Sequence, residues 1–204
     1  MTIKKILHPK LKFNDLTYGF FTRKGGYSKS PYDSLNCSVN VEDNENDVKK
    51  NLILVCNELK LEKLIKLNQI HSSSVFVVKN KSDQINDVKA DGLVTKLKGI
   101  GLSILGADCA PILFYDEISK IIGACHAGWR GSINGIIETT VSNMESLGAK
   151  RNNIISIIGP TIHKESYEIK KDVASIVKKT KFYKKNDSIL FQVNDDKYLF
   201  DLPL

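Results

Sequence analysis

The chain has 204 residues, of which 42% are hydrophobic and 26% are charged, a balance that excludes disordered and low-complexity proteins. Its longest apolar runs, such as Ile121 to Ala127, are much shorter than the roughly 20 residues of a membrane span, and its start lacks the apolar segment of a signal peptide. We therefore expect one globular domain over residues 1–204, in the cytoplasm and without a membrane.

The net charge of +7 comes from 30 Lys and Arg against 23 Asp and Glu. Most of the excess is lysine in scattered pairs, whereas nucleic-acid-binding proteins concentrate Arg and Lys beside aromatic residues on one face. The four cysteines, Cys37, Cys56, Cys109 and Cys125, show no CxxC spacing and predict free thiols in a reducing compartment. We expect no nucleic-acid partner and no obligate protein partner.

The first predicted helix follows Asp43, a candidate N-cap, and places Val48, Leu52, Val55, Cys56 and Leu59 on one face. Cys56 on that stripe is read as a core residue rather than a reactive one. Short β-branched runs then predict strands at Val75 to Val78, Gly101 to Leu105, Ile112 to Tyr115, Ile121 to Cys125 and Ile154 to Ile158. The polar stretches Lys79 to Lys89 and Lys178 to Asp187 are interpreted as surface loops.

A longer helix is predicted from Ser132, as its cap, to Gly148, as its stop, because the apolar residues between them fall on one face. A weaker helix is expected from about Lys170 to Lys179. Alternation of Ile189, Phe191 and Val193 predicts a late strand. The predicted class is α+β, with mixed β-sheets flanked by helices.

The segment from Gly106 to Gly131 contains two of these strands, joined by a turn near Asp116 to Ser119. If Tyr115 pairs with Lys120, the antiparallel register places Cys109 opposite His126. Opposed Cβ atoms lie about 4.5–5.5 Å apart. A thiolate and an imidazole at that distance can share a metal ion, or act as a nucleophile and its base.

A third candidate ligand is His71, in the sequence LNQIHSSSV at the start of a predicted strand. One Cys and two His leave a fourth zinc position open, which is typical of catalytic rather than structural zinc. Spacing alone leaves an alternative open, namely that each of these residues is a packed, hydrogen-bonded residue without a metal.

Charged residues near this segment suggest phosphate binding and proton transfer. Arg130 lies at a predicted helix N-terminus and suits phosphate oxygens, unless it pairs with a surface carboxylate while Trp129 fills the core. A basic glycine turn with Arg23 and Lys24 is a second candidate phosphate site. Asp91 and Asp108 are candidates for proton transfer, although Asp91, before a glycine, is equally consistent with a plain turn.

Several motifs occur together in one order. They are FTRKGG, PYDSLN, NQIHSSSV, ADGLVT, GADCAPIL, CHAGWRG and IGPTIHKESYEI. From about Gly19 to Leu202 the chain therefore resembles the YfiH family, historically called the multicopper polyphenol oxidoreductase or laccase-domain family. Motif matching implies His71, Cys109 and His126 as zinc ligands. The fold implied is similar to that of a toxin deamidase with a Cys-His pair.

The resemblance also implies an activity. Family members look like purine nucleoside phosphorylases that accept adenosine, inosine and 5′-methylthioadenosine, with adenosine deaminase activity in addition, and bacterial relatives have been linked to peptidoglycan-precursor editing. The expected ligands are therefore a small-molecule nucleoside and phosphate, with zinc as cofactor and copper able to replace it. Four histidines, His8, His71, His126 and His163, are too few for a multicopper oxidase.

Two departures from the family pattern are visible. Asn40 stands where a histidine is common, and the chain stops at Leu204, where family members usually continue to a Ser-Tyr-Arg-Arg motif, so we expect it to lack that segment. Two alternatives to the phosphorylase follow from the same residues. One is a metal-free hydrolase or amidase with Cys109 as nucleophile and His126 as base, and the other is an inactive relative that binds a nucleoside or a partner protein.

Overall fold

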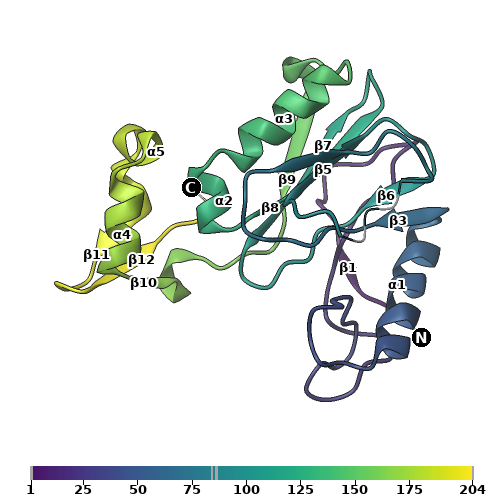
Figure 1. Cartoon of the computed structure of the whole chain (residues 1–204), viewed down its shortest axis with the longest axis horizontal. Coiled ribbons are helices and arrows are strands. Elements are labelled where there is room, and N and C mark those ends of the chain that lie inside the picture. The colour runs from purple at the N-terminus through teal and green to yellow at the C-terminus, as the bar shows by residue number, and fades with distance from the viewer. Residues whose placement is uncertain (1, 84, 86, 204) are drawn as a thin grey trace.

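A computed structural model describes residues 2–83, 85 and 87–203 of the chain. Its largest sheet has five strands in the spatial order β4 (Val75–Val77), β5 (Gly92–Thr95), β8 (Ile121–Ala127), β7 (Ala110–Asp116) and β9 (Ile154–Ile158). Only β4 and β5 are parallel, and the other neighbours are antiparallel. Figure 1 shows this sheet at the centre of the molecule, with helices outside it. The predicted α+β class with mixed sheets is confirmed.

The β7–β8 hairpin has a different register from the predicted one. Asp116 pairs with Ile121 and Pro111 pairs with His126, so the expected pairing of Cys109 with His126 is wrong. The reason lies in the turn, where Asp116 stays in the ladder while its carboxylate accepts hydrogen bonds from the backbone N–H groups of Ile118 and Ser119. Cys109 lies one residue before β7, on the same strand face as Pro111 because side chains alternate.

Helical structure covers one face of this sheet in two pieces, α2 (Trp129–Ile133) and α3 (Ile136–Ser146). One helix from Ser132 to Gly148 was expected. The break falls at Gly135, whose φ of 84° belongs to the left-handed region that glycine tolerates. The buried residues of α3 are Ile136, Thr140 and Met144. Ile136 and Met144 pack with strand residues such as Ile112, Ile121 and Cys125 to form the main core.

The N-terminal part contributes β1 (Lys5–Ile6) paired with β2 (Phe20–Phe21), β3 (Lys63–Ile65) paired with β6 (Ile100–Leu102), and α1 (Glu45–Leu59). The N-cap of α1 is Asn44, one residue after the predicted Asp43, because the Asn44 side chain accepts from the backbone N–H groups of Asn46 and Asp47. The buried stripe of α1 includes a polar residue, Asn51, as well as Val48 and Val55. The short strands β3 and β5 were not predicted.

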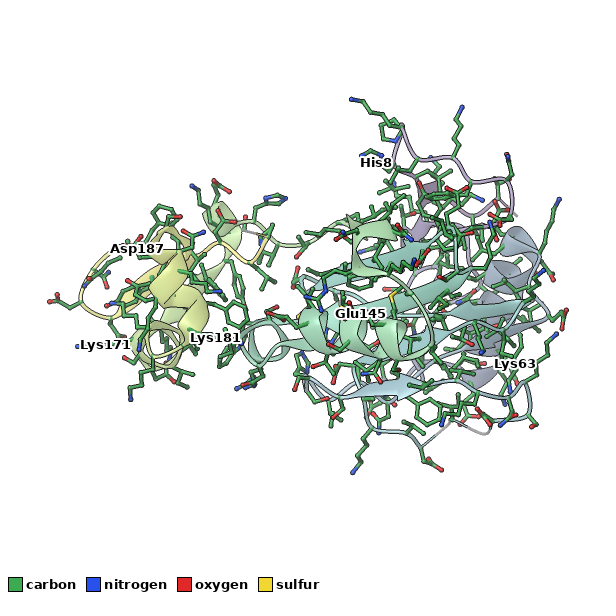
Figure 2. The ribbon with its side chains drawn as sticks, turned by 90° about the horizontal axis from the view of Figure 1, so that it is seen from above. His8, Lys63, Glu145, Lys171, Lys181 and Asp187 are labelled. Atoms are coloured by element: carbon green, nitrogen blue, oxygen red, sulfur yellow. The ribbon has the colours of Figure 1, made fainter. Side chains whose placement is uncertain are left out.

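The C-terminal residues form a lobe with its own sheet, in the order β10 (Glu168–Lys170), β12 (Lys197–Phe200), β11 (Leu190–Gln192). The lobe also contains α4 (Lys171–Lys178) and α5 (Lys181–Lys185). It lies at one end of the molecule in Figure 2, with Lys171 and Lys181 far from Lys63 at the other end. Trp129 and Ile133 of α2 pack against its core, so α2 joins the lobe to the central sheet.

The predicted surface loop from Lys178 to Asp187 is wrong, because Thr180 caps α5 there. In the other predicted loop, Lys79 to Lys89, residues 84 and 86 lie outside the described part of the chain. The described residues also form three short 3₁₀ helices, at Arg151–Asn153, Lys164–Ser166 and Asp187–Ile189. Of the described helices, none has both the length and the apolar character that a membrane crossing requires.

Candidate metal centre

Three side chains that were expected as metal ligands come together at one end of the central sheet. The ligand atoms of His71, Cys109 and His126 all lie within 4.8 Å of one another. Cys109 Sγ is 4.0 Å from His71 Nε2, and the two imidazole rings lie edge to face with centroids 4.8 Å apart. His126 is buried, Cys109 is half-buried and His71 is exposed, so the group can be reached from solvent.

Asp91 holds His126 in place from the neighbouring strand. The His126 Nδ1 atom is 2.9 Å from Asp91 Oδ1, and the His126 backbone N–H donates to the Asp91 carbonyl at 2.7 Å. Asp91 immediately precedes β5, which pairs with β8 through Gly92 and Cys125. A carboxylate that takes Nδ1 of a histidine leaves Nε2 for a metal, an arrangement common around zinc.

The same carboxylate holds the loop that carries His71. Asp91 accepts hydrogen bonds from the backbone N–H groups of Ile70, His71 and Ser72 at 3.2, 3.0 and 2.7 Å, and from the Ser72 hydroxyl at 2.8 Å. His71 itself has a φ of 59°, a conformation that costs free energy for a non-glycine residue and persists where surrounding contacts fix it. Asp91 is therefore a buried anchor for both histidines.

The charge states of this pair favour that role. Burial disfavours the ionised carboxylate, but hydrogen bonds from His126, Ser72 and Ile70 outweigh it and hold the pKa of Asp91 at about 2. Burial lowers the pKa of His126, but its contacts with Asp91 and Cys109 outweigh this and raise it to about 9. At neutral pH Asp91 is thus ionised and keeps a proton on Nδ1 of His126. Without a metal ion His126 also carries a proton on Nε2, which a bound metal would displace.

The three ligands fit zinc. With bonds of about 2.3 Å to sulfur and 2.0 Å to nitrogen, a tetrahedral ion needs its S and N ligands about 3.5 Å apart, close to the 4.0 Å between Cys109 and His71. Gly128 keeps the space between them open, because a Cβ there would lie 3.0 Å from both Cys109 Sγ and His71 Cδ2. One thiolate and two imidazoles form a set that zinc accepts while keeping a position for substrate.

A loop after β9 holds the peptide that precedes Cys109. The Asp108 carbonyl accepts from the Thr161 hydroxyl at 2.7 Å and from the Ile162 N–H at 2.8 Å. Asp108 has a φ of 75° and an exposed side chain. Of the two aspartates that the sequence singled out, Asp108 is the one whose carboxylate remains open to a substrate.

Tyr167 is coupled electrostatically to Arg130 and to Cys109. Burial raises the pKa of the Tyr167 phenol, the charges of Cys109 and Asp108 act in the same direction, and the charge of Arg130 opposes them. Arg130 stacks over the Trp129 ring at 4.4 Å, and within the described part of the chain no ion pair joins it to a carboxylate. Sequence reasoning did not single out Tyr167, whose only signal was its place in IGPTIHKESYEI.

Other predicted site residues lie apart from this group. Arg23 pairs with Asp33 at 3.4 Å on the surface, and no contact of the described residues joins Arg23 or Lys24 to the three ligands. His163 is exposed before a short 3₁₀ helix, and His8 contacts Tyr18 and Lys10. Neither histidine belongs to the metal-capable group.

Two named relatives have sequences similar to most of this chain. A Rickettsia prowazekii protein named purine nucleoside phosphorylase is 33% identical over 192 residues, which cover 91% of this chain and 74% of the relative. A Corynebacterium glutamicum protein of the same name is 37% identical over 158 residues, which cover 76% of this chain and 64% of the relative. The chain thus spans between 64% and 74% of the length of these curated relatives.

Solved structures show the same fold. A Neisseria meningitidis protein of the DUF152 group has a TM-score of 0.84 and 28% identity, covering 98% of this chain and 79% of its own. The Bacillus licheniformis protein YfiH also has a TM-score of 0.84 and 28% identity, covering 93% of this chain and 74% of its own. A family model described as "Multi-copper polyphenol oxidoreductase laccase" matches residues 17–204. The chain therefore belongs to this laccase-domain family, which includes YfiH.

Proposed function

We propose that the chain is a zinc-dependent purine nucleoside phosphorylase, in which His71, Cys109 and His126 bind the zinc ion. The observation that carries the proposal is the convergence of these three ligand atoms within 4.8 Å, in a chain whose relatives are named purine nucleoside phosphorylases. When bound, zinc would supply Lewis-acid activation at this point. The ligands proposed are a nucleoside and inorganic phosphate, without a nucleic-acid or obligate protein partner.

The proposed substrates are inosine, adenosine and 5′-methylthioadenosine. In phosphorolysis a phosphate oxygen bonds to C1′ of the ribose while the bond from C1′ to N9 breaks, and the purine leaves with the electron pair and takes up a proton. Arg130 would bind the phosphate, because its guanidinium has no competing carboxylate within the described residues. Asp108, with an exposed carboxylate beside Cys109, would exchange the proton with the purine.

We propose adenosine deaminase activity as a second reaction of the same centre. Water would add its oxygen at C6 of the purine, and the amino group would leave as ammonia after protonation. Both carboxylate oxygens of Asp91 already have hydrogen-bond partners, and the pKa of this group is about 2. We therefore propose that Asp91 positions the two histidines and does not transfer protons. The proton carrier proposed for this step is again Asp108.

Phosphorolysis can be measured directly with inosine, by following hypoxanthine release with and without phosphate. The parent protein should need phosphate and should form ribose 1-phosphate, while Cys109→Ala should lose at least about a hundredfold in rate, since it removes a ligand. Cys56→Ala, in α1, is the matched control and should keep the parent rate. Equal rates in Cys109→Ala and the parent would contradict a role for the centre.

One observation favours a second candidate function. Cys109, His126 and Asp91 contain the parts of a cysteine nucleophile, its base and an orienting carboxylate. A metal-free hydrolase or amidase would use this set, and labelling by iodoacetamide separates the two functions. Protection of Cys109 by added zinc supports the phosphorylase, whereas stoichiometric labelling that zinc does not change supports the hydrolase.

A further inference from the structure

Gln69 joins two loops that each carry a proposed metal ligand. Its Nε2 donates to the Leu105 carbonyl at 2.9 Å, and its Oε1 accepts from the Leu105 N–H at 2.8 Å. A side-chain amide here makes the same pair of hydrogen bonds that one strand residue makes to another. Gln69 stands two residues before His71, and Leu105 stands four residues before Cys109.

The same two segments are also joined upstream of these loops, by the parallel β3–β6 ladder and by the Ser103 N–H, which donates to the Ile65 carbonyl at 2.8 Å. Apart from the approach of Cys109 Sγ to His71 Nε2, the Gln69 pair supplies the hydrogen bonds that join residues 66–74 to residues 104–109 within the described chain. Asp91 fixes His71 relative to His126, but it makes no described hydrogen bond to the Cys109 loop. Asp91 and the β7–β8 ladder therefore connect His71 and Cys109 only through His126, whereas Gln69 joins their two loops directly.

We propose that Gln69 is a positioning residue that sets the distance between His71 and Cys109 for metal capture, an inference that rests on the proposed metal centre. A centre whose ligands are preorganised binds metal more tightly than one whose loops must be ordered on binding. Partners outside the ligand shell commonly change metal affinity by about 10–100-fold. We expect an effect of this size from the Gln69 pair.

The chemistry of the pair explains why glutamine is needed. Leu105 offers one donor and one acceptor, and a carboxamide matches both, whereas a carboxylate would face the Leu105 carbonyl with a second acceptor. Asparagine has the same amide but is one methylene shorter. Methionine has a similar length and volume to glutamine but can serve neither group.

The test compares Gln69→Met and Gln69→Asn with Gln192→Met in the full chain. Gln192 is the matched control, because it is an exposed glutamine of the C-terminal lobe whose side chain makes one described hydrogen bond, to the Asn194 carbonyl. Zinc affinity is measured by competition with a chelator, and cobalt is used as a second probe through its thiolate charge-transfer absorption. Both Gln69 variants should bind zinc about 10–100-fold more weakly and show a weaker thiolate band, while Gln192→Met should match the parent.

A metal-free measurement keeps the inference testable apart from activity. Hydrogen exchange at the Leu105 amide should become at least about tenfold faster in both Gln69 variants, with circular dichroism unchanged, because the amide loses its acceptor. Parent-like zinc affinity in both variants, or an equal loss in Gln192→Met, would overturn the inference. A parent protein that binds no zinc would overturn both this inference and the metal centre, whereas zinc binding that depends on Gln69 without phosphorolysis would overturn the proposed function alone.

Discussion

The β7–β8 hairpin and the loop before β4 hold their metal ligands in different ways. His126 lies within a seven-pair antiparallel ladder, and Cys109 lies one residue outside it, so the backbone of the sheet fixes them. His71 lies in a loop with a left-handed backbone conformation, and its position depends on the side chains of Asp91 and Gln69. A ligand held by a ladder resists single substitutions, whereas a ligand held by side chains can be lost through one.

Of the substitutions considered, Asp91→Ala should have the largest effect, because it removes the side chain that holds the His71 loop. It leaves three backbone N–H groups, the Ser72 hydroxyl and His126 without their buried acceptor. We expect the free energy of unfolding to fall by about 3–5 kcal/mol, because a buried charged partner has been removed. Urea denaturation of the metal-free protein measures this change.

The control for this substitution is Asp83→Ala, which removes another carboxylate that accepts two backbone N–H groups, from Lys79 and Asn80, in a more exposed loop. Its urea midpoint should stay much nearer to that of the parent. If the two variants were equally destabilised, the anchoring of His71 by a buried carboxylate would not be the cause.

Gly128→Ala changes the space between the two types of ligand without removing one. The added Cβ would meet Cys109 Sγ and His71 Cδ2, each at 3.0 Å, and must push one of them away. Because the exposed loop yields more easily than the hairpin, we expect His71 to move and zinc affinity to fall by about tenfold or more.

Gly106→Ala is the matched control for Gly128→Ala. Its Cβ would meet nothing nearer than the Cys109 carbonyl at 3.5 Å, an ordinary contact. Chelator competition should therefore give the parent zinc affinity for Gly106→Ala. An unchanged affinity in Gly128→Ala would show that the site is wider than the structure indicates.

Asp116→Asn tests the hairpin and should have the smallest effect. Burial raises the pKa of Asp116, but backbone N–H groups of Ser119, Lys150 and Ile118 outweigh it and hold the pKa below the ordinary 3.8. The stability from this ionised carboxylate is therefore fully present above the ordinary pKa and is lost as pH falls through the lowered one. Asp116→Asn should lower the free energy of unfolding by about 1 kcal/mol at pH 7. The variant should still bind zinc, and it should lose less stability than the parent on acidification.

Denaturation of both proteins at pH 7 and in acid, down to about pH 3 where the ordinary carboxyl pKa has been passed, checks this prediction. The gap between parent and variant should narrow as the pH falls. A gap that is constant with pH would mean that the Asp116 charge does not contribute, and loss of zinc at pH 7 would mean that the turn controls the metal centre.

Much of the hairpin could be predicted from the sequence. The β-branched runs in β7, β8 and β9 identify strands locally, and the class follows from them. The register could not be predicted, because it depends on whether Asp116 is the last residue of the strand or the first of the turn. Asp116 is in the strand, and its carboxylate accepts hydrogen bonds from the turn backbone. A helix break at Gly135 is likewise invisible to the apolar pattern, which continues through it.

The structure of the loop that carries His71 was much harder to predict from the sequence. The family motifs indicated His71 as a ligand, but its backbone conformation and its contact with Asp91, 20 residues away, leave no periodic pattern. Gln69 meets Leu105 across 36 residues, and Tyr167, whose pKa the charges of Cys109 and Asp108 raise, follows β9 in the chain. Such contacts form only when the sheet brings distant segments together, so no local sequence pattern predicts them.

The central claim is that His71, Cys109 and His126 form one metal centre. The most direct test is the zinc content of the parent, His71→Ala and His163→Ala, purified without added copper and measured by elemental analysis. We expect about one zinc per chain in the parent and in His163→Ala, as for a centre of three protein ligands, and almost none in His71→Ala. Full zinc in His71→Ala, loss of zinc in His163→Ala, or several tightly bound coppers in the parent would contradict the account.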